Sequence, residues 1–203
     1  MIDEGYIKFE SDWQKTEALD NAEIESLIRW RWPLYDAGLI GYYKEHGIGF
    51  GNLSVRAGAE GQFIISGTQT GHLPDPGAEH YALVKNYDIE RNRVTSIGAH
   101  EASSESMTHA AIYELNPDIT AVVHVHSETL WAGLKGSAAT TDAEVAFGTP
   151  EMAREFRRLF RETDFCRTGI AVMAGHEAGL VSTGSNLQEA AERILALDAK
   201  FRT

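Results

Sequence analysis

The sequence predicts an α/β protein in which helices cover a mixed β-sheet. Short β-branched segments bounded by turn residues occupy the middle of the chain, and amphipathic segments lie at both ends and between them. This arrangement is typical of a sheet with helices packed on it. The 203 residues contain no internal repeat, low-complexity tract or linker. We therefore expect a single domain over residues 1–203.

The first predicted helix runs from Asp20 to roughly Tyr35. Asp20 is the expected N-cap, and Glu23 follows three residues later, as in a capping box. The apolar stripe consists of Ile24, Leu27 and Ile28. Pro33 should kink or end the helix, and Gly38 marks the exit.

Two hairpins are predicted next, because apolar segments alternate with turn residues. The strands are expected at residues 53–55, 63–65, 81–84 and 93–96. The first pair is linked by the glycine-containing residues 57–61, and the second by the turn 90–92. Further strands are expected over residues 170–174 and 180–182.

The remaining helices are predicted from their first residues. Ser103 or Ser104 is the expected N-cap of a helix over residues 104–115. Thr149 and Pro150 suit the N-cap and first position of another helix. A turn at residues 184–186 precedes the last helix.

Composition narrows the classes of partner. A formal net charge of -12 argues against a nucleic-acid or anionic-membrane surface, since both need clustered Lys and Arg. The lone cysteine, Cys166, rules out an intramolecular disulfide and a cysteine-based zinc cluster. The first residues lack the basic and apolar regions of a signal peptide, and no apolar run approaches the roughly 20 residues that span a bilayer. We expect a cytoplasmic protein with a small-molecule ligand.

His124 and His126 lie on a predicted buried strand, with β-branched residues at 122, 123 and 125. Side chains alternate along a strand, so both imidazoles lie on one face. They can share a divalent cation, with zinc the first candidate. The alternative is that each histidine is a polar residue hydrogen-bonded to the backbone.

Three segments are candidates for binding an anion. Residues 47–56 are rich in glycine, and residues 66–71 form a loop of small residues whose amides and hydroxyls can surround a ligand. The third is the helix start at Ser103 and Ser104, where free amides favour negative charge. Glu105 in that turn also suits the helix dipole, so its alternative role is a plain helix-start carboxylate.

Several motifs together resemble the class II aldolase/adducin family, which includes fuculose-1-phosphate aldolase and ribulose-5-phosphate 4-epimerase. The resemblance extends over roughly residues 20 to 200. Its motifs, in chain order, are Leu34–Ile40, Gly51–Arg56, Ile65–Gly67, Ser103–Glu105 with His109, the strand with His124 and His126, Phe147–Thr149, and His176 ahead of Asn186–Leu187.

The resemblance implies a three-layer αβα fold with a central mixed, mostly antiparallel sheet, and a cyclic homotetramer with active sites between subunits. It also implies that His124, His126 and His176 hold a divalent metal, most simply zinc, and that Glu105 is the catalytic acid/base. The positions matching the family's phosphate site are Asn52, Ser66, Gly67, Ser103 and Ser104.

The implied activity is that of a metal-dependent, aldolase-like lyase. Such an enzyme cleaves or forms a C–C bond in a small phosphorylated sugar or hydroxy-ketone through a metal-stabilised enediolate. Glutamate at position 105, where aspartate is the alternative, fits the aldolase branch better than the epimerase branch. A dehydratase, decarboxylase or epimerase of the same family is the nearest alternative, and a non-catalytic adducin-like binding domain is another.

The chain departs from the aldolases in the segment from Ser127 to Ala146, which is short and contains no tyrosine to serve as proton donor. Its acidic residues are Glu128, Asp142 and Glu144. Glu144 corresponds to a glutamate region of the family's dehydratase branch, or is a solvated loop carboxylate. The aldolases also have a longer C-terminal tail. Glu177 either tunes the metal from beside His176 or faces solvent.

Overall fold

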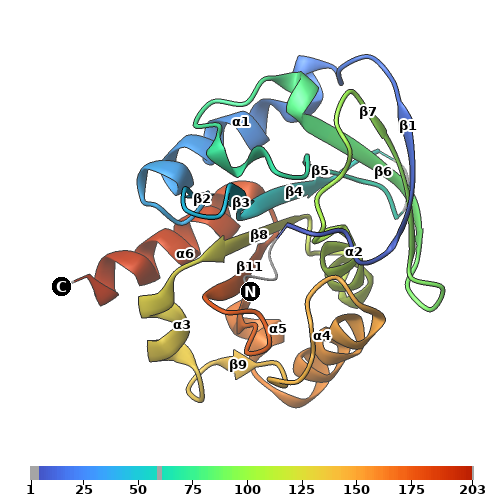
Figure 1. Cartoon of the computed structure of the whole chain (residues 1–203). Coiled ribbons are helices and arrows are strands. Elements are labelled where there is room, and N and C mark those ends of the chain that lie inside the picture. Colours follow the sequence, from blue (N-terminus) through green and yellow to red (C-terminus); the bar gives the residue numbers. More distant parts are fainter. Residues whose placement is uncertain (1–4, 59–60, 203) are drawn as a thin grey trace.

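The computed structural model describes residues 5–58 and 61–202. Its central element is a nine-stranded sheet (Figure 1). Its order is β1-β7-β6-β5-β4-β8-β11-β10-β9. Neighbours are antiparallel except β1–β7 and β9–β10 at the two edges. The strands are β1 (Glu10–Lys15), β4 (Asn52–Arg56), β5 (Phe63–Ser66), β6 (Tyr81–Asp88), β7 (Arg93–Gly98), β8 (Ala121–His126), β9 (Ala139–Thr140), β10 (Ile170–Val172) and β11 (Gly179–Gly184).

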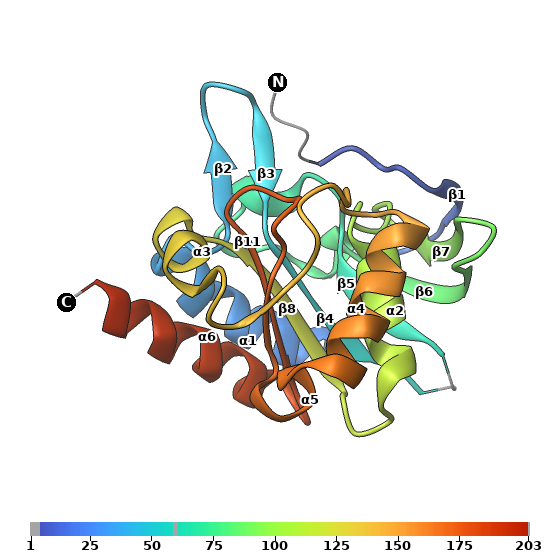
Figure 2. The same cartoon turned by 90° about the horizontal axis from the view of Figure 1, so that it is seen from below.

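Helices cover both faces of the sheet, which confirms the predicted three-layer αβα architecture with a mostly antiparallel sheet (Figure 2). One layer contains α1 (Asn21–Asp36), α3 (Glu128–Leu134) and α6 (Leu187–Phe201). The other contains α2 (Ser106–Leu115), α4 (Pro150–Glu162) and α5 (Phe165–Thr168). Each layer has its own hydrophobic core against the sheet.

Strand β8 lies between β4 and β11 in the middle of the sheet, and all six of its residues are buried. Val123 and Val125 belong to the core under α1 and α6, whereas Val122 belongs to the core under α2 and α4. The strand alternation therefore places His124 and His126 on the α2 side, the same face as Val122. Both histidines face the same side, as predicted.

The predicted helix boundaries are confirmed at three N-termini. The side chains of Asp20, Thr149 and Asn186 accept hydrogen bonds from the first-turn amides of α1, α4 and α6. Helix α1 passes through Pro33 and ends at Asp36, and Gly38 follows with a φ of 72°.

The predicted start of α2 was wrong. The helix begins at Ser106, and its N-cap is Glu105, whose side chain makes no capping bond. Ser103 instead accepts the Glu105 amide at 3.2 Å, within a turn that precedes the helix. The consequence is that the Glu105 side chain is not used in capping and is available to the site.

Several short elements were not predicted. They include β1, β9, α3, α5, two 3₁₀ turns (Thr70–His72 and Ala78–His80) and a separate hairpin of β2 (Gly41–Tyr43) and β3 (Ile48–Phe50). These elements are too short to show a clear hydrophobic period. Among the helices that the structure describes, none has the length and apolar character needed to cross a bilayer.

Candidate metal centre and polar pocket

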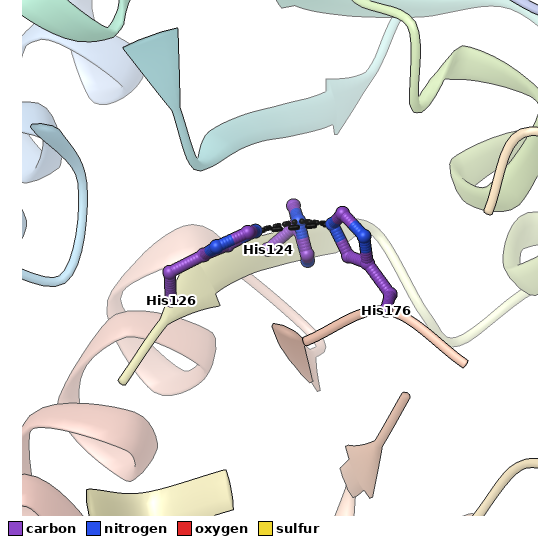
Figure 3. A group of neighbouring side chains, drawn as sticks. All are labelled: His124, His126 and His176. Carbon is purple, nitrogen blue, oxygen red and sulfur yellow. Dashed lines mark hydrogen bonds between the residues drawn. The ribbon is translucent and has the colours of Figure 1, made fainter. Parts of the chain in front are cut away.

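Three histidines converge on one point at the end of β8 (Figure 3). His124 and His126 come from the strand, and His176 comes from the turn between β10 and β11. The antiparallel pairing of β11 with β8 sets Gly179 opposite His126, so it brings this turn beside the strand end. The fold thus brings together residues about 50 positions apart, the three that the family resemblance implies as metal ligands.

The spacing of the three rings fits a metal ion. The Nε2 atoms are separated by 3.1 Å (His124–His126), 3.0 Å (His126–His176) and 3.3 Å (His176–His124). Three nitrogens bound tetrahedrally at the usual zinc distance lie about 3.3 Å apart. In a neutral imidazole, each ring nitrogen carries either one N–H donor or one acceptor lone pair. Three Nε2 atoms in mutual contact therefore cannot all form hydrogen bonds with one another. A cation at their centre resolves that conflict.

The protonation of the rings also suits ligation. The Nδ1–H of His124 donates to the Leu180 carbonyl at 3.0 Å, which leaves its Nε2 lone pair free to ligate. His126 Nδ1 lies 3.0 Å from the hydroxyl of Tyr43, on β2. Burial lowers the pKa of His124 to about 4, and burial lowers the pKa values of His126 and His176 well below the usual value. All three are neutral at pH 7, the form that binds metal.

A glycine makes room for His176. A Cβ added to Gly179 would lie 2.5 Å from the Cδ2 of the His176 ring and 3.0 Å from its carbonyl oxygen. Phe147 packs on the other side of that ring, with centroids 4.4 Å apart. The ring is therefore held between neighbours that fix its direction.

Glu105 lies against the histidines. Its Oε1 is 3.7 Å from His176 Nε2, and the side chain is 1% exposed. Both carboxylate oxygens are buried. Burial raises the pKa of Glu105 to about 7, while the Thr108 hydroxyl, as a hydrogen-bond donor, and the charge of Lys8 act in the opposite direction. A buried carboxylate in this state indicates a functional group.

Lys8 was missed by sequence reasoning, because nothing in its local pattern sets it apart from a surface lysine. Its Nζ lies 3.7 Å from the centre of the Phe147 ring, and its charge lowers the pKa of both Glu105 and His176. The backbone carbonyl of Lys8 accepts a hydrogen bond from Asn92 at 2.7 Å. The segment before β1 therefore brings a positive charge to the candidate metal centre.

A small polar pocket of about 20 Å³, close to the volume that holds one water molecule, lies next to these residues. Four of the five predicted phosphate-binding residues line it, namely Asn52, Gly67, Ser103 and Ser104. Asn52 pairs across the sheet with His124, and its Oδ1 is buried without a partner among the described residues. The pocket and the metal centre are thus adjacent.

Ser66 is placed differently from the other four. Its hydroxyl contacts the backbone nitrogen and oxygen of Leu53, at 3.3 and 3.4 Å, and it is not among the residues lining the pocket. Gln69 and Thr70, from the loop 66–71 that the sequence suggested as an anion-binding segment, also line it. Gln69 has a φ of 58°, and its side-chain oxygen accepts a hydrogen bond from the Gly49 amide at 3.0 Å. This bond across the pocket helps to hold the left-handed backbone conformation of Gln69.

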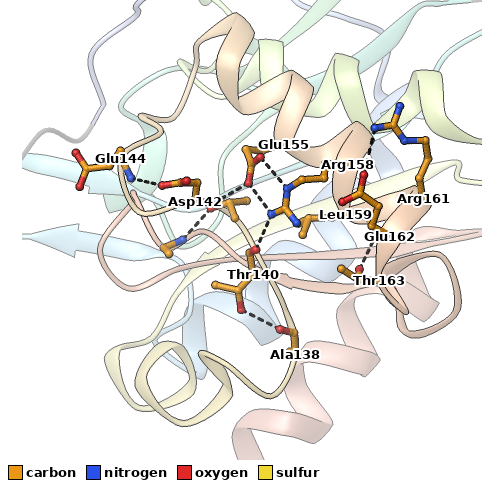
Figure 4. A network of polar contacts seen from close by, with 12 residues as sticks. Ala138, Thr140, Asp142, Glu144, Glu155, Arg158, Leu159, Arg161, Glu162 and Thr163 are labelled. Atoms are coloured by element: carbon orange, nitrogen blue, oxygen red, sulfur yellow. Dashed lines mark hydrogen bonds and ion pairs between the residues drawn. The ribbon is translucent and has the colours of Figure 1, made fainter.

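The acidic residues of the segment 127–146 lie away from the histidines. Glu128, Asp142 and Glu144 are exposed. Asp142 accepts the Glu144 amide at 2.8 Å, while its own amide donates to Glu155 on α4, which pairs with Arg158 (Figure 4). Figure 4 shows the Glu144 carboxylate directed out of this network. Glu177, beside His176, is exposed to solvent.

Comparison with known proteins places these features in context. The sequence model described as "Class II Aldolase and Adducin N-terminal domain" matches residues 39–203. A methylthioribulose-1-phosphate dehydratase from Hahella chejuensis (strain KCTC 2396) is 32% identical over 66 residues, which are 32% of this chain and 31% of that protein. The match therefore spans less than a third of the dehydratase.

Two solved structures share the fold. One is YgbL from Klebsiella pneumoniae, described as a putative aldolase/epimerase/decarboxylase, with a TM-score of 0.66, 22% identity and coverage of 90% of this chain and 87% of that one. The other is an L-fuculose-1-phosphate aldolase from Thermus thermophilus, with a TM-score of 0.63, 20% identity and coverage of 90% and 92%.

Proposed function

The chain belongs to the class II aldolase and adducin family, and we propose that it is a metal-dependent lyase of the aldolase type. The proposed reaction cleaves or forms a C–C bond in a small phosphorylated sugar or hydroxy-ketone. The observation that carries this proposal is the triangle of His124, His126 and His176 Nε2 atoms with the buried Glu105 carboxylate 3.7 Å from one of them. A scaffold domain has no need to bury a carboxylate beside three converging imidazoles.

We assign the three histidines as ligands of a divalent ion, with zinc as the first choice, since imidazole nitrogens at this spacing suit it. When bound, the ion supplies Lewis-acid polarisation of a carbonyl group. The chain's own part is to keep all three rings neutral, to aim them through the Leu180 and Tyr43 contacts, and to leave one side of the triangle open toward Glu105.

Glu105 is the proposed proton carrier. When the C–C bond is cleaved, the hydroxyl group on one of its two carbons loses its proton and becomes the carbonyl of the aldehyde product. The other carbon keeps the electron pair of the bond and gains a proton. A single carboxylate next to both atoms can accept the first proton and return it to the second. The carboxylate is 1% exposed, so its proton is shielded from exchange with bulk solvent.

The polar pocket is the proposed phosphate site. Ser104 lines this pocket, and Glu105, the next residue in the chain, lies against His176. The pocket and the proposed metal centre are therefore joined by consecutive residues. A sugar phosphate whose phosphate group is held at Asn52, Gly67, Ser103 and Ser104 can extend its carbon chain toward the histidines. The hydroxyls of Ser103 and Ser104 can donate to the phosphate, and the N-terminus of α2 at Ser106 favours its negative charge. Ser66 supports this pocket through Leu53.

A dehydratase is the second candidate. The partial match to a methylthioribulose-1-phosphate dehydratase and the lack of a tyrosine in residues 127–146 favour it. In that case Glu144, which is exposed here, would act in a neighbouring subunit. A homotetramer, one domain over residues 1–203 and a cytoplasmic location remain our further proposals, supported by the family resemblance and the sequence.

The test combines product analysis with variants. A panel of hydroxy-ketone phosphates is incubated with the metal-loaded protein, and aldehyde, water loss or carbon dioxide is measured. We expect aldehyde release that falls at least about a hundredfold in Glu105→Gln and is unchanged in the exposed control Glu177→Gln. Full turnover in Glu105→Gln would exclude the lyase mechanism, and loss of water without cleavage would establish the dehydratase.

A further inference from the structure

Arg31 on α1 is a buried charge outside the metal centre. Its side chain is 1% exposed, and it lies on the same inner face of the helix as Leu27 and Leu34. Burial lowers the pKa of Arg31 to about 10, so the guanidinium stays charged at neutral pH. Charges this deep are normally paired with an opposite charge.

The partners of Arg31 are neutral. Its Nη2 donates to the carbonyls of Thr70 (2.9 Å), Gly71 (3.1 Å) and Leu73 (2.8 Å), and its Nε donates to Leu73 as well (3.3 Å). Nη1 has no partner, and no carboxylate lies within 4 Å of the group, in the part of the chain that the structure describes. Among residues 5–58 and 61–202, the charge therefore has no carboxylate counter-ion.

The polar pocket lies on the other side of the same loop. Gln69, Thr70 and Gly71 line the pocket, and the carbonyls of Thr70 and Gly71 point to Arg31. In a trans peptide the N–H points opposite to the C=O, so the Gly71 amide is directed away from Arg31. It lies toward Gly49, where an added Cβ would come within 2.7 Å of the Gly71 nitrogen. Gly49 also lines the pocket.

We propose that Arg31 is a positioning residue of the polar pocket, and that its buried charge makes the pocket prefer a doubly charged phosphate group to a singly charged carboxylate. The inference rests on the proposed function, which assigns an anion to this pocket. Arg31 orients the loop dipoles with their positive ends on the pocket side. It also attracts the ligand in proportion to the ligand's charge, so a dianion gains twice as much as a monoanion.

The test uses inorganic phosphate and acetate as probes at pH 8 and low ionic strength. Apparent affinities come from the thermal unfolding midpoint of the zinc-loaded full chain at increasing ligand concentration, which reports weak binding as well. The variants are Arg31→Gln, which removes the charge, and Arg31→Lys, which keeps it. Arg29→Gln, an exposed position on the same helix, is the matched control.

In Arg31→Gln we expect phosphate affinity to fall about tenfold and acetate affinity about threefold, so that the preference for phosphate narrows by about threefold. Arg31→Lys should keep the preference, and Arg29→Gln should match the wild type. A collapse of the loop would weaken both ligands equally, so equal losses, or none, would overturn the proposal. If Arg31→Gln fails to fold, Arg31→Lys provides the test, because it keeps the charge. Loss of the preference for phosphate over acetate in Arg31→Lys would also overturn the proposal.

Ser104→Ala separates this proposal from the proposed function. It should weaken phosphate binding, because Ser104 lines the pocket. A wild type that binds zinc but no phosphate, or phosphate binding unaffected by Ser104→Ala, would remove the phosphate site of the proposed function and this inference with it. Phosphate binding that depends on Ser104 with a preference independent of Arg31 would overturn the inference alone.

Discussion

Replacing Glu105 with glutamine is expected to stabilise the metal-free protein at pH 8. The carboxylate is 1% exposed. Burial raises its pKa from 4.5 to about 7, so the folded state holds the proton more tightly than the unfolded chain does. Below pH 4.5 the group is neutral in both states and costs nothing. Stability is lost progressively as the pH rises from 4.5 through the folded-state pKa of about 7, and the loss is complete above it.

The size of the effect follows from that difference in pKa. Each pKa unit corresponds to about 1.4 kcal/mol. A rise from 4.5 to about 7 therefore destabilises the metal-free fold by about 3 kcal/mol at pH 8, and by about 1.5 kcal/mol at pH 5.5. Glutamine has the same shape and does not titrate. Glu105→Gln should exceed the wild type in unfolding free energy by these amounts.

Urea unfolding of chelator-treated protein at the two pH values measures this difference. The exposed variant Glu177→Gln should match the wild type at both. Added zinc should stabilise the wild type more than Glu105→Gln, because the cation offsets the buried negative charge. If Glu105→Gln is no more stable at pH 8, or if its advantage does not change with pH, then the carboxylate is not the uncompensated buried acid inferred from the geometry.

Two further variants test how the ligands are held. Gly179→Ala should weaken zinc binding at least about tenfold, because the new Cβ meets the His176 ring at 2.5 Å. Gly58→Ala, where a Cβ meets nothing within 4 Å, should bind zinc normally, and equal zinc affinity in both would contradict the packing argument. Tyr43→Phe removes the hydroxyl 3.0 Å from His126 Nδ1 and should cost about tenfold in zinc affinity by competition with a chelating dye. An unchanged affinity would show that Tyr43 does not orient the ring.

Strand periodicity was enough to place two of the three histidines of the candidate metal centre on one face of a strand. The apolar neighbours of His124 and His126 established a buried strand, and its alternation placed both rings on one face. His176 could not be placed from local pattern, because the pairing of β11 with β8 brings it there. The family resemblance supplied that residue, and it also supplied the role of Glu105.

Helix signals were less informative around Glu105. Two serines before it suggested a capping residue, but the chain makes a tight turn there and the helix starts at Ser106. Arg31 has the sequence character of a surface arginine next to Trp30 and Trp32. Only the position of the loop 69–73 against α1 shows that it is buried. Contacts between segments distant in sequence are the information that a single sequence lacks.

Metal content by mass spectrometry on tag-free protein tests the central claim most directly. Wild type should contain about one equivalent of a divalent metal per chain. His126→Ala should lose the metal, while the exposed control His46→Ala should retain it. A wild type that stays metal-free after reconstitution with zinc, while remaining folded, would mean that the three histidines are structural and would contradict the proposed lyase mechanism.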